Sequence, residues 1–286
     1  MYASKLDKFL FIKSNKTAGT SLEIALTKCL ANKPDQFFTP LSFKDEQLRE
    51  NLSGKTFSED MLSILPVKKS KSRLLRVKIT TLLNHLRSSP PKNKHRDGYR
   101  HKTEIFFLLT GFRTHSTYSE CLNSYPDFSE YWSCCFARHP YKRFLSHLTW
   151  RAKTIKNTKS WTTADWQSYA KQSVNNFQKR NLLHYAYDRK SRTYVKTILA
   201  FEKLKESTNL ICEKISLEPN SILNAMPRTK SGFSKVISNI KPSEIIGPDI
   251  RSKLLSNEEF LFREMGYKDS LDDFMPSRAW IKPSNL

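Results

Sequence analysis

Short apolar runs alternate with segments of helical periodicity along this chain. Buried strands are predicted at Phe9–Ile12, Glu104–Leu109, Tyr131–Ala137 and Lys196–Glu202. Helices are predicted at Ser21–Leu30, from Pro140 onward, over much of 151–195, at Lys203–Ile215, and in a last helix that ends at Gly266. Strands that alternate with helices favour the α/β class, with a central parallel sheet flanked by helices on both faces.

One block of the chain departs from this pattern. Residues 67–102 contain twelve Lys or Arg and one acid, Asp97, around a helical stripe of apolar positions from Leu75 to Leu86. "SSPPKNKHRDG" then interrupts the stripe as a loop. We therefore expect a single domain over residues 1–286, with 67–102 as a basic helical and loop insertion within it.

The charge balance adds a preference for polyanions. The 286 residues include 49 Lys or Arg against 27 Asp or Glu, a net charge of +22. Such a charge attracts nucleic acid, anionic glycans, membrane surfaces or phosphorylated cofactors without naming one of them. No stretch approaches the ~18 apolar residues of a membrane-spanning helix, and the N-terminus has no signal peptide. The five cysteines contain no CxxC motif, which favours packed, reduced thiols.

The stretch "KFLFIKSNKTAGTSLEIAL" is the first candidate site. A strand, a short loop and a helix start present backbone N–H groups at the positive end of the helix dipole. Lys16 adds a charge, Gly19 permits close approach of an anion, and Thr17, Thr20 and Ser21 add hydroxyl groups. A Walker A loop has its lysine after the last glycine, so a standard ATP or GTP loop is disfavoured. An ordinary helix start after a strand fits the same residues.

The stretch "CCFARHPYKRFLSHL" is the second candidate. Arg138 ends a predicted strand, at the edge where open α/β sheets bind ligands. Pro140 suits the first turn of a helix, and Ser146 follows two turns later. Taken separately, Arg138 also fits a surface salt bridge and Ser146 an exposed helix hydroxyl.

Together the two stretches resemble a known family. "FLFIKSNKTAGTSL" is similar to the 5′-phosphosulfate loop of sulfotransferases, and "FARHPYKRFLSHL" to their 3′-phosphate element. The version here most resembles the carbohydrate sulfotransferases that include the heparan sulfate 2-O- and chondroitin 4-O-sulfotransferases. "ILAFEKLKES" and "EEFLFREMGY" continue the resemblance in order. The chain departs from the family with Asn15 for a usual Pro and His139 for a usual Asn, and resembles it weakly across 33–102.

The resemblance implies a P-loop-like fold and a donor, 3′-phosphoadenosine 5′-phosphosulfate (PAPS), whose sulfuryl group moves to a sugar hydroxyl and leaves the product PAP. By residue match, Lys16 lies beside the bridging oxygen. The 5′-phosphate is held by loop residues (Thr17, Ala18, Gly19, Thr20, Ser21), and the 3′-phosphate by Arg138 and Ser146. The sequence shows no metal-ligand cluster, and this chemistry needs no metal.

The resemblance also suggests residues near the acceptor. His115, in "RTHSTYSEC", matches a histidine that serves as the base; a solvated loop histidine is the plain alternative, and His101, His139 and His147 compete for the role. Gln178 and Asn181 match a segment beside the acceptor, although exposed helix amides fit equally. Arg228 and Lys230 lie where the family often closes a loop over the nucleotide.

These observations predict a carbohydrate sulfotransferase, with an anionic polysaccharide as a candidate acceptor. The alternatives are a non-catalytic protein that binds nucleic acid or anionic glycan, and a kinase-like nucleotide enzyme. The kinase-like alternative lacks a Walker B acid and a lysine after the glycine. We expect no specific nucleic acid partner and a cytoplasmic, bacterial-type location, or the Golgi lumen if an N-terminal anchor was removed.

Overall fold

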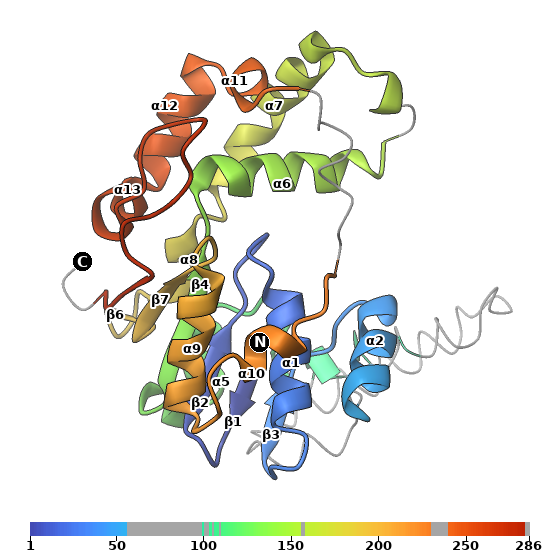
Figure 1. Cartoon of the computed structure of the whole chain (residues 1–286), viewed down its shortest axis with the longest axis vertical. Coiled ribbons are helices and arrows are strands. Elements are labelled where there is room, and N and C mark those ends of the chain that lie inside the picture. Colours follow the sequence, from blue (N-terminus) through green and yellow to red (C-terminus); the bar gives the residue numbers. More distant parts are fainter. Residues whose placement is uncertain are drawn as a thin grey trace, which may run out of the picture.

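The computed structural model describes residues 1–55, 99, 103–104, 106–108, 110–155, 158–229 and 240–283. Within them a mixed sheet has the strand order β3-β1-β2-β4-β7-β8 (Figure 1). Its strands are β1 (Tyr2–Ser4), β2 (Phe9–Ile12), β3 (Gln36–Phe38), β4 (Trp132–Ala137), β7 (Thr197–Ala200) and β8 (Trp280–Ile281). A separate two-stranded ribbon pairs β5 (Tyr187–Asp188) with β6 (Thr193–Tyr194).

The chain is therefore α/β, but its sheet is only partly parallel. β2, β4 and β7 are parallel neighbours in the centre. β1 runs antiparallel to both β2 and β3, and β8 runs antiparallel to β7. The expected central parallel sheet is thus confirmed for β2, β4 and β7, while the antiparallel strands at both edges were not expected. The sequence did not indicate β1, β3 and β8, because strands of two or three residues leave too short a pattern to distinguish from a loop.

Three of the four predicted central strands are confirmed, with β2 matching its predicted bounds and β4 and β7 lying within theirs. The prediction at Glu104–Leu109 is wrong, because the described residues of this segment are helical. The Thr110 hydroxyl donates to the Phe106 carbonyl at 2.8 Å, one helical turn earlier. A short apolar run does not distinguish a buried strand from a buried helix, and here Phe106 packs on Phe37 of β3 at 5.6 Å.

The helices described in the first half are α1 (Gly19–Cys29), α2 (Phe43–Ser53), α5 (Tyr118–Ser124), the 3-10 turn η2 (Pro126–Ser129) and α6 (Pro140–Ala152). Two of them, α1 and α6, were predicted, although α1 begins two residues earlier than expected; α2, α5 and the turn η2 were not predicted. The segment 151–195, predicted as helical, also contains the β5–β6 ribbon. The later helices are α7 (Thr163–Gln178), α8 (Leu182–Ala186), α9 (Leu204–Lys214), α10 (Ser221–Ala225), α11 (Pro242–Ile245), α12 (Pro248–Asn257) and α13 (Glu259–Met265), with a 3-10 turn η3 (Thr158–Ser160). As predicted, the last helix ends at Gly266, whose φ of 67° suits a glycine after a helix.

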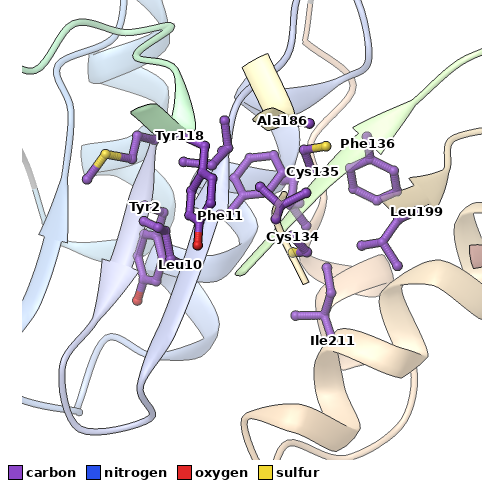
Figure 2. Close-up of a cluster of buried hydrophobic side chains, with 14 of the residues drawn as sticks. Tyr2, Leu10, Phe11, Tyr118, Cys134, Cys135, Phe136, Ala186, Leu199 and Ile211 are labelled. Atoms are coloured by element: carbon purple, nitrogen blue, oxygen red, sulfur yellow. The ribbon is translucent and has the colours of Figure 1, made fainter. Parts of the chain in front are cut away.

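The main hydrophobic core surrounds the central strands. β2 reads FLFI and is buried along its whole length, as expected for a strand covered on both sides. Cys134 and Cys135 are adjacent on β4 and point to opposite faces of the sheet. Figure 2 shows Ile211 of α9 on the side of Cys134 and Ala186 of α8 on the side of Cys135. All five cysteines are free thiols, and four are buried, which confirms their interpretation as packed side chains.

A second hydrophobic cluster lies among α6, α7, α11 and α12, in the helical part at the top of Figure 1. α6 joins the two parts, because it begins directly after β4 and carries Phe144 and Leu148 into this cluster. The predicted basic insertion 67–102 lies almost entirely outside the described residues. Of that block only Tyr99 is described, and its hydroxyl donates to the Leu41 carbonyl at 2.8 Å.

Candidate functional site

The carboxyl ends of β2 and β4 bring the two predicted anion-binding elements together. Because the strands are parallel neighbours, the loop after β2 and the residues after β4 emerge at the same edge of the sheet. Nη1 of Arg138 donates to the carbonyl of Lys16 at 3.2 Å. Ser14 Oγ donates to the Phe136 carbonyl at 2.6 Å and ties the loop to β4. Two segments about 120 residues apart in sequence thus form one site.

The loop backbone takes an unusual conformation. Lys16 has φ 64° and Ala18 has φ 57°, both in the left-handed region that non-glycine residues rarely enter. Ala18 is the N-cap of α1, and it has no side chain that could accept a hydrogen bond from the first turn of that helix. The positive end of the α1 dipole therefore lies at the loop. Such backbone arrangements bind anions.

The hydroxyl groups of the loop have protein contacts of their own. Thr17 is fully buried, and its Oγ1 lies 2.8 Å from Ser14 Oγ. The Thr17 hydroxyl therefore stabilises the loop. The predicted contact of Thr17 with a phosphate would then be made by its backbone N–H. Ser21 Oγ lies 2.6 Å from Oγ1 of Thr229, and Thr20 is also largely buried. The contact to Thr229 brings the segment after α10 against the start of α1.

Gly19 is required by the packing of a neighbouring lysine. A Cβ atom at this position would lie 2.5 Å from Cγ of Lys13, which is closer than real side chains approach. The Lys13 side chain is only 2% exposed, and its stem runs along the start of α1. From the sequence, Gly19 was expected because a glycine permits the close approach of an anion. The packing against Lys13 is a second reason for a glycine at this position.

Lys13 belongs to a buried cluster of charges behind the loop. Its Nζ lies 3.0 Å from Glu23 of α1, and Glu23 also lies 3.5 Å from Arg49 and 3.4 Å from the Met1 ammonium. Burial alone would raise the pKa of Glu23, but the neighbouring cations lower it below its ordinary value. Burial also lowers the pKa of the Met1 amine to about 6. At neutral pH, Lys13 and Arg49 are thus balanced by Glu23 and by Glu46, 3.3 Å from Arg49.

His115 lies beside this cluster with a defined orientation. Its Nδ1 is 3.0 Å from the Lys13 carbonyl, so Nδ1 must carry the proton and donate it. Nε2 is then the unprotonated nitrogen of the neutral ring. His115 as a whole residue is exposed, but burial of its ring and the Lys13 ammonium lower the pKa of His115 to about 3. The imidazole is therefore neutral at physiological pH, in the state that accepts a proton.

Arg138 is held in a partly apolar environment at the end of β4. Its guanidinium lies 4.8 Å from the centre of the Phe201 ring, and its buried Nε has no hydrogen-bond partner among the described residues. Burial lowers the pKa of Arg138, while the carboxylate of Glu202 opposes this effect. Glu202 itself accepts hydrogen bonds from the His139 N–H at 3.0 Å and from the Tyr267 hydroxyl at 2.6 Å.

α6 carries Ser146, His147 and Trp150 toward the same loop. Lys16 Nζ lies 5.0 Å from the centre of a Trp150 ring, and Trp150 is 45% exposed. Ser146 is half-buried one helical turn earlier, on the same face as Trp150. His147 is 7% exposed, and neither ring nitrogen has a partner among the described residues. Burial, Arg151 and Lys16 lower the pKa of His147 to about 4.

His139 is disfavoured as the base because its ring has a structural role. It is fully buried as the N-cap of α6, and its Nδ1 accepts a hydrogen bond from the Tyr141 N–H at 3.3 Å. Its Nε2 lies 3.0 Å from the Lys268 carbonyl. Both nitrogens are thus engaged by the backbone. His101, another competitor for the role of base, lies outside the described residues.

The remaining predicted residues have no described contact with the loop. Gln178 donates to the Lys253 carbonyl at 3.0 Å, and Asn181 caps α8 by accepting from the His184 N–H at 2.9 Å. Both amides therefore have structural roles in the helical part, and their contact with an acceptor stays a prediction. Arg228 is exposed in the segment that reaches α1 through Thr229, while Lys230 lies outside the described residues.

Two parts of this site were not predicted from the sequence. Trp150 was treated only as a helix anchor, although its spacing of four from Ser146 puts both on one helix face. Glu23, an acid between Leu22 and Ile24 in an apolar helix, was also overlooked. A charge in such a position is rarely buried unless it is paired, so this rule predicts a cationic partner for Glu23 but does not identify it.

Comparisons with protein-family models, with curated proteins and with solved structures found no significant match to this chain. Within the described residues there is no cluster of three or more His, Cys, Asp or Glu side chains able to hold a metal ion. In the same part of the chain, no helix has the length and apolar character needed to cross a membrane.

Proposed function

We propose that this protein is a PAPS-dependent sulfotransferase with a P-loop-like site and a carbohydrate acceptor. The observation that carries the proposal is the hydrogen bond from Arg138 to the Lys16 carbonyl. It joins an uncapped helix start to a strand-end arginine whose buried Nε has no described partner. One anion site of this kind fits many ligands, whereas two adjacent sites fit a nucleotide with phosphates at both its 5′ and 3′ positions.

We assign each charged part of PAPS to residues of this chain. The N–H groups of Ala18, Gly19 and Thr20 bind the 5′-phosphate at the start of α1. The Arg138 guanidinium binds the 3′-phosphate, with the Ser146 hydroxyl as a second donor. The Lys16 ammonium stabilises the negative charge of the leaving oxygen. When bound, PAPS supplies an activated sulfuryl group for in-line transfer to a hydroxyl oxygen.

His115 supplies the base in this proposal. Its Nδ1 proton is directed at the Lys13 carbonyl, so Nε2 is free to take the proton of the acceptor hydroxyl. Bound phosphates favour the protonated imidazolium, and they therefore raise the pKa of His115 from its low value toward the range of an effective base. His147 is the second candidate, because it is buried without a described partner beside Lys16.

Isothermal titration with adenosine 3′,5′-bisphosphate tests the nucleotide site directly. We expect micromolar binding that weakens about tenfold or more in Lys16→Ala and in Arg138→Ala, since each removes a charge-assisted contact. Lys28→Ala is the matched control, because Lys28 is exposed at the far end of α1, and it leaves binding unchanged. A transfer assay with labelled donor over a glycan panel then identifies the acceptor. In that assay His115→Gln reduces turnover by about 10²- to 10⁴-fold while nucleotide binding persists.

Two results would overturn the proposal. Absence of nucleotide binding, with Lys16→Ala indistinguishable from wild type, contradicts a PAPS site. Tight binding of nucleic acid without binding of the bisphosphate favours the non-catalytic polyanion-binding alternative, which the net charge of +22 supports. Full activity of His115→Gln rejects only the assignment of the base.

A further inference from the structure

A hollow lies at the opposite edge of the sheet from the candidate site. It has a volume of about 1000 Å³ and is bounded by the starts of β4 and β7, the β5–β6 ribbon, the end of α9 and β8. Trp132 and Thr197 are the first residues of β4 and β7, whereas Arg138 follows the last residue of β4. Six residues of strand separate the two edges, or roughly 17 Å at the usual rise. The hollow is therefore not part of the nucleotide site.

Aromatic rings form one part of the lining. Trp280 of β8 is 42% exposed, so a large part of its surface is in contact with solvent. Trp132 stacks on Phe9 with 5.7 Å between ring centres, and Tyr194 packs on Tyr187 at 4.5 Å. These contacts fix the rings in place before a ligand arrives. Fixed aromatic surfaces beside polar groups are typical of ligand sites.

Cationic side chains form the other part. The lining includes Arg192, Lys196, Lys214 and Lys282 against one acid, Glu213. Glu213 pairs with Lys214 at 2.8 Å, and Lys196 Nζ donates to the Glu130 carbonyl at 2.9 Å. Arg192 and Lys282 are exposed, and the described residues offer them no ion-pair partner. The hollow thus has an excess of positive charge that its own acid does not neutralise.

We propose that this hollow binds a segment of an anionic carbohydrate, with sugar rings against Trp280 and sulfate or carboxylate groups on Arg192 and Lys282. The site goes beyond the proposed transfer reaction and does not depend on it. Together with the sheet edge that carries Lys16, it gives the protein two separate contacts for charged ligands.

The polar lining favours a sugar over a single-stranded nucleic acid. Thr193 and Ser129 contribute hydroxyl groups, and the Glu213 carboxylate accepts hydrogen bonds. Sugar hydroxyls donate to such acceptors, whereas the phosphodiester backbone of single-stranded DNA has no hydroxyl group to donate. Non-specific sites for single strands instead follow the backbone along an open, positively charged groove. This hollow is bounded on several sides by β8, α9 and the ribbon.

The test is isothermal titration of the full chain, without nucleotide, with a sulfated glycosaminoglycan hexasaccharide. Arg192→Glu/Lys282→Glu is expected to weaken binding by about tenfold or more, because it removes charge-assisted contacts and adds repulsion. The control Lys44→Glu/Lys171→Glu makes the same change of net charge at exposed lysines on α2 and α7, and leaves binding within about twofold. In the wild type the hexasaccharide quenches tryptophan fluorescence, and Trp280→Phe removes most of this quenching.

Three results would overturn the proposal. The first is an equal loss of hexasaccharide affinity in both double variants, which indicates general charge attraction. The second is an unchanged hexasaccharide affinity in Arg192→Glu/Lys282→Glu, and the third is binding of a single-stranded DNA 12-mer with the same dependence on Arg192 and Lys282. Titration with adenosine 3′,5′-bisphosphate separates this site from the nucleotide site. The hollow variants retain that binding, while Lys16→Ala loses it and retains the fluorescence response to the glycan.

Discussion

Replacement of Glu23 by glutamine probes the charges behind the loop with almost no change of shape. Glu23 is fully buried and contacts Lys13 at 3.0 Å, Arg49 at 3.5 Å and the Met1 ammonium at 3.4 Å. Glu23→Gln removes the carboxylate that the two buried cations Lys13 and Arg49 share, whereas Glu46 still pairs with Arg49. Breaking a buried pair from one side costs about 3–5 kcal/mol, a large part of the ~5–15 kcal/mol that stabilises a typical domain.

The same change also weakens the site. The Lys13 carbonyl orients His115, and the Lys13 stem packs against Gly19. When Lys13 loses Glu23, its ammonium is drawn toward solvent and both contacts are disturbed. We therefore expect the affinity for adenosine 3′,5′-bisphosphate to fall about tenfold, although Glu23 is behind the loop and touches no ligand.

Urea unfolding at pH 8 measures how much Glu23→Gln lowers the free energy of unfolding. The wild type and the variant can be compared if this free energy falls with urea concentration at the same slope in both. Glu50→Gln is the matched control, since Glu50 is exposed on α2, and it changes the free energy of unfolding by less than about 0.5 kcal/mol. The double variant Lys13→Met/Glu23→Leu recovers most of the loss, because apolar side chains replace a buried pair at little cost. A loss below about 1 kcal/mol in Glu23→Gln would refute the reasoning, since it means that water reaches Lys13 and Arg49.

Two further predictions concern packing and pH. Gly19→Ala destabilises the protein by about 1–3 kcal/mol and weakens nucleotide binding, because its Cβ collides with Lys13 at 2.5 Å. Gly247→Ser, at a helix start with open space around it, is neutral in the same unfolding assay, and equal effects of the two changes would contradict the role of Lys13. His139 and His147 are buried with pKa values of about 4, below the ~6.5 of an unfolded chain, so their contribution is complete above pH 6.5 and is lost as the pH falls toward 4. Each histidine contributes a slope of up to about 1.4 kcal/mol per pH unit, and His147→Leu removes one such slope. An unchanged slope between pH 6.5 and 4 would show that His147 titrates normally.

The sequence was sufficient for the elements that carry the site, for reasons that the structure makes clear. β2 is apolar throughout, and Ser133 is the one polar residue of β4, so both strands read as buried runs of the kind that helices cover. Their parallel pairing then puts Lys16 and Arg138 at one edge. The strand prediction at Glu104–Leu109 was wrong because the same apolar composition suits a helix packed on Phe37. Periodicity describes which face is buried, and it does not describe what covers that face.

Sequence patterns did not identify which groups form hydrogen bonds or ion pairs across long sequence separations. Nothing in the spacing of Lys13 indicates that its side chain turns inward to Glu23, since lysines after strands are usually solvated. Gln178 and Asn181 resembled acceptor contacts, but their amides bind the carbonyl of Lys253 and the N–H of His184. Such choices depend on which backbone groups remain unsatisfied nearby, and this is known only after the chain has folded.

The hydrogen bond between Arg138 and the Lys16 carbonyl holds the loop in place, together with the left-handed backbone of Lys16 and Ala18. The loss of conformational freedom in this loop therefore accompanies folding rather than ligand binding. In the proposed site, a bound phosphate would meet donors that folding has already positioned, so less of its interaction energy would be spent on ordering the protein. The affinity of the site is then linked to the stability of the buried charges beneath it, and mutations far from any ligand atom can change it.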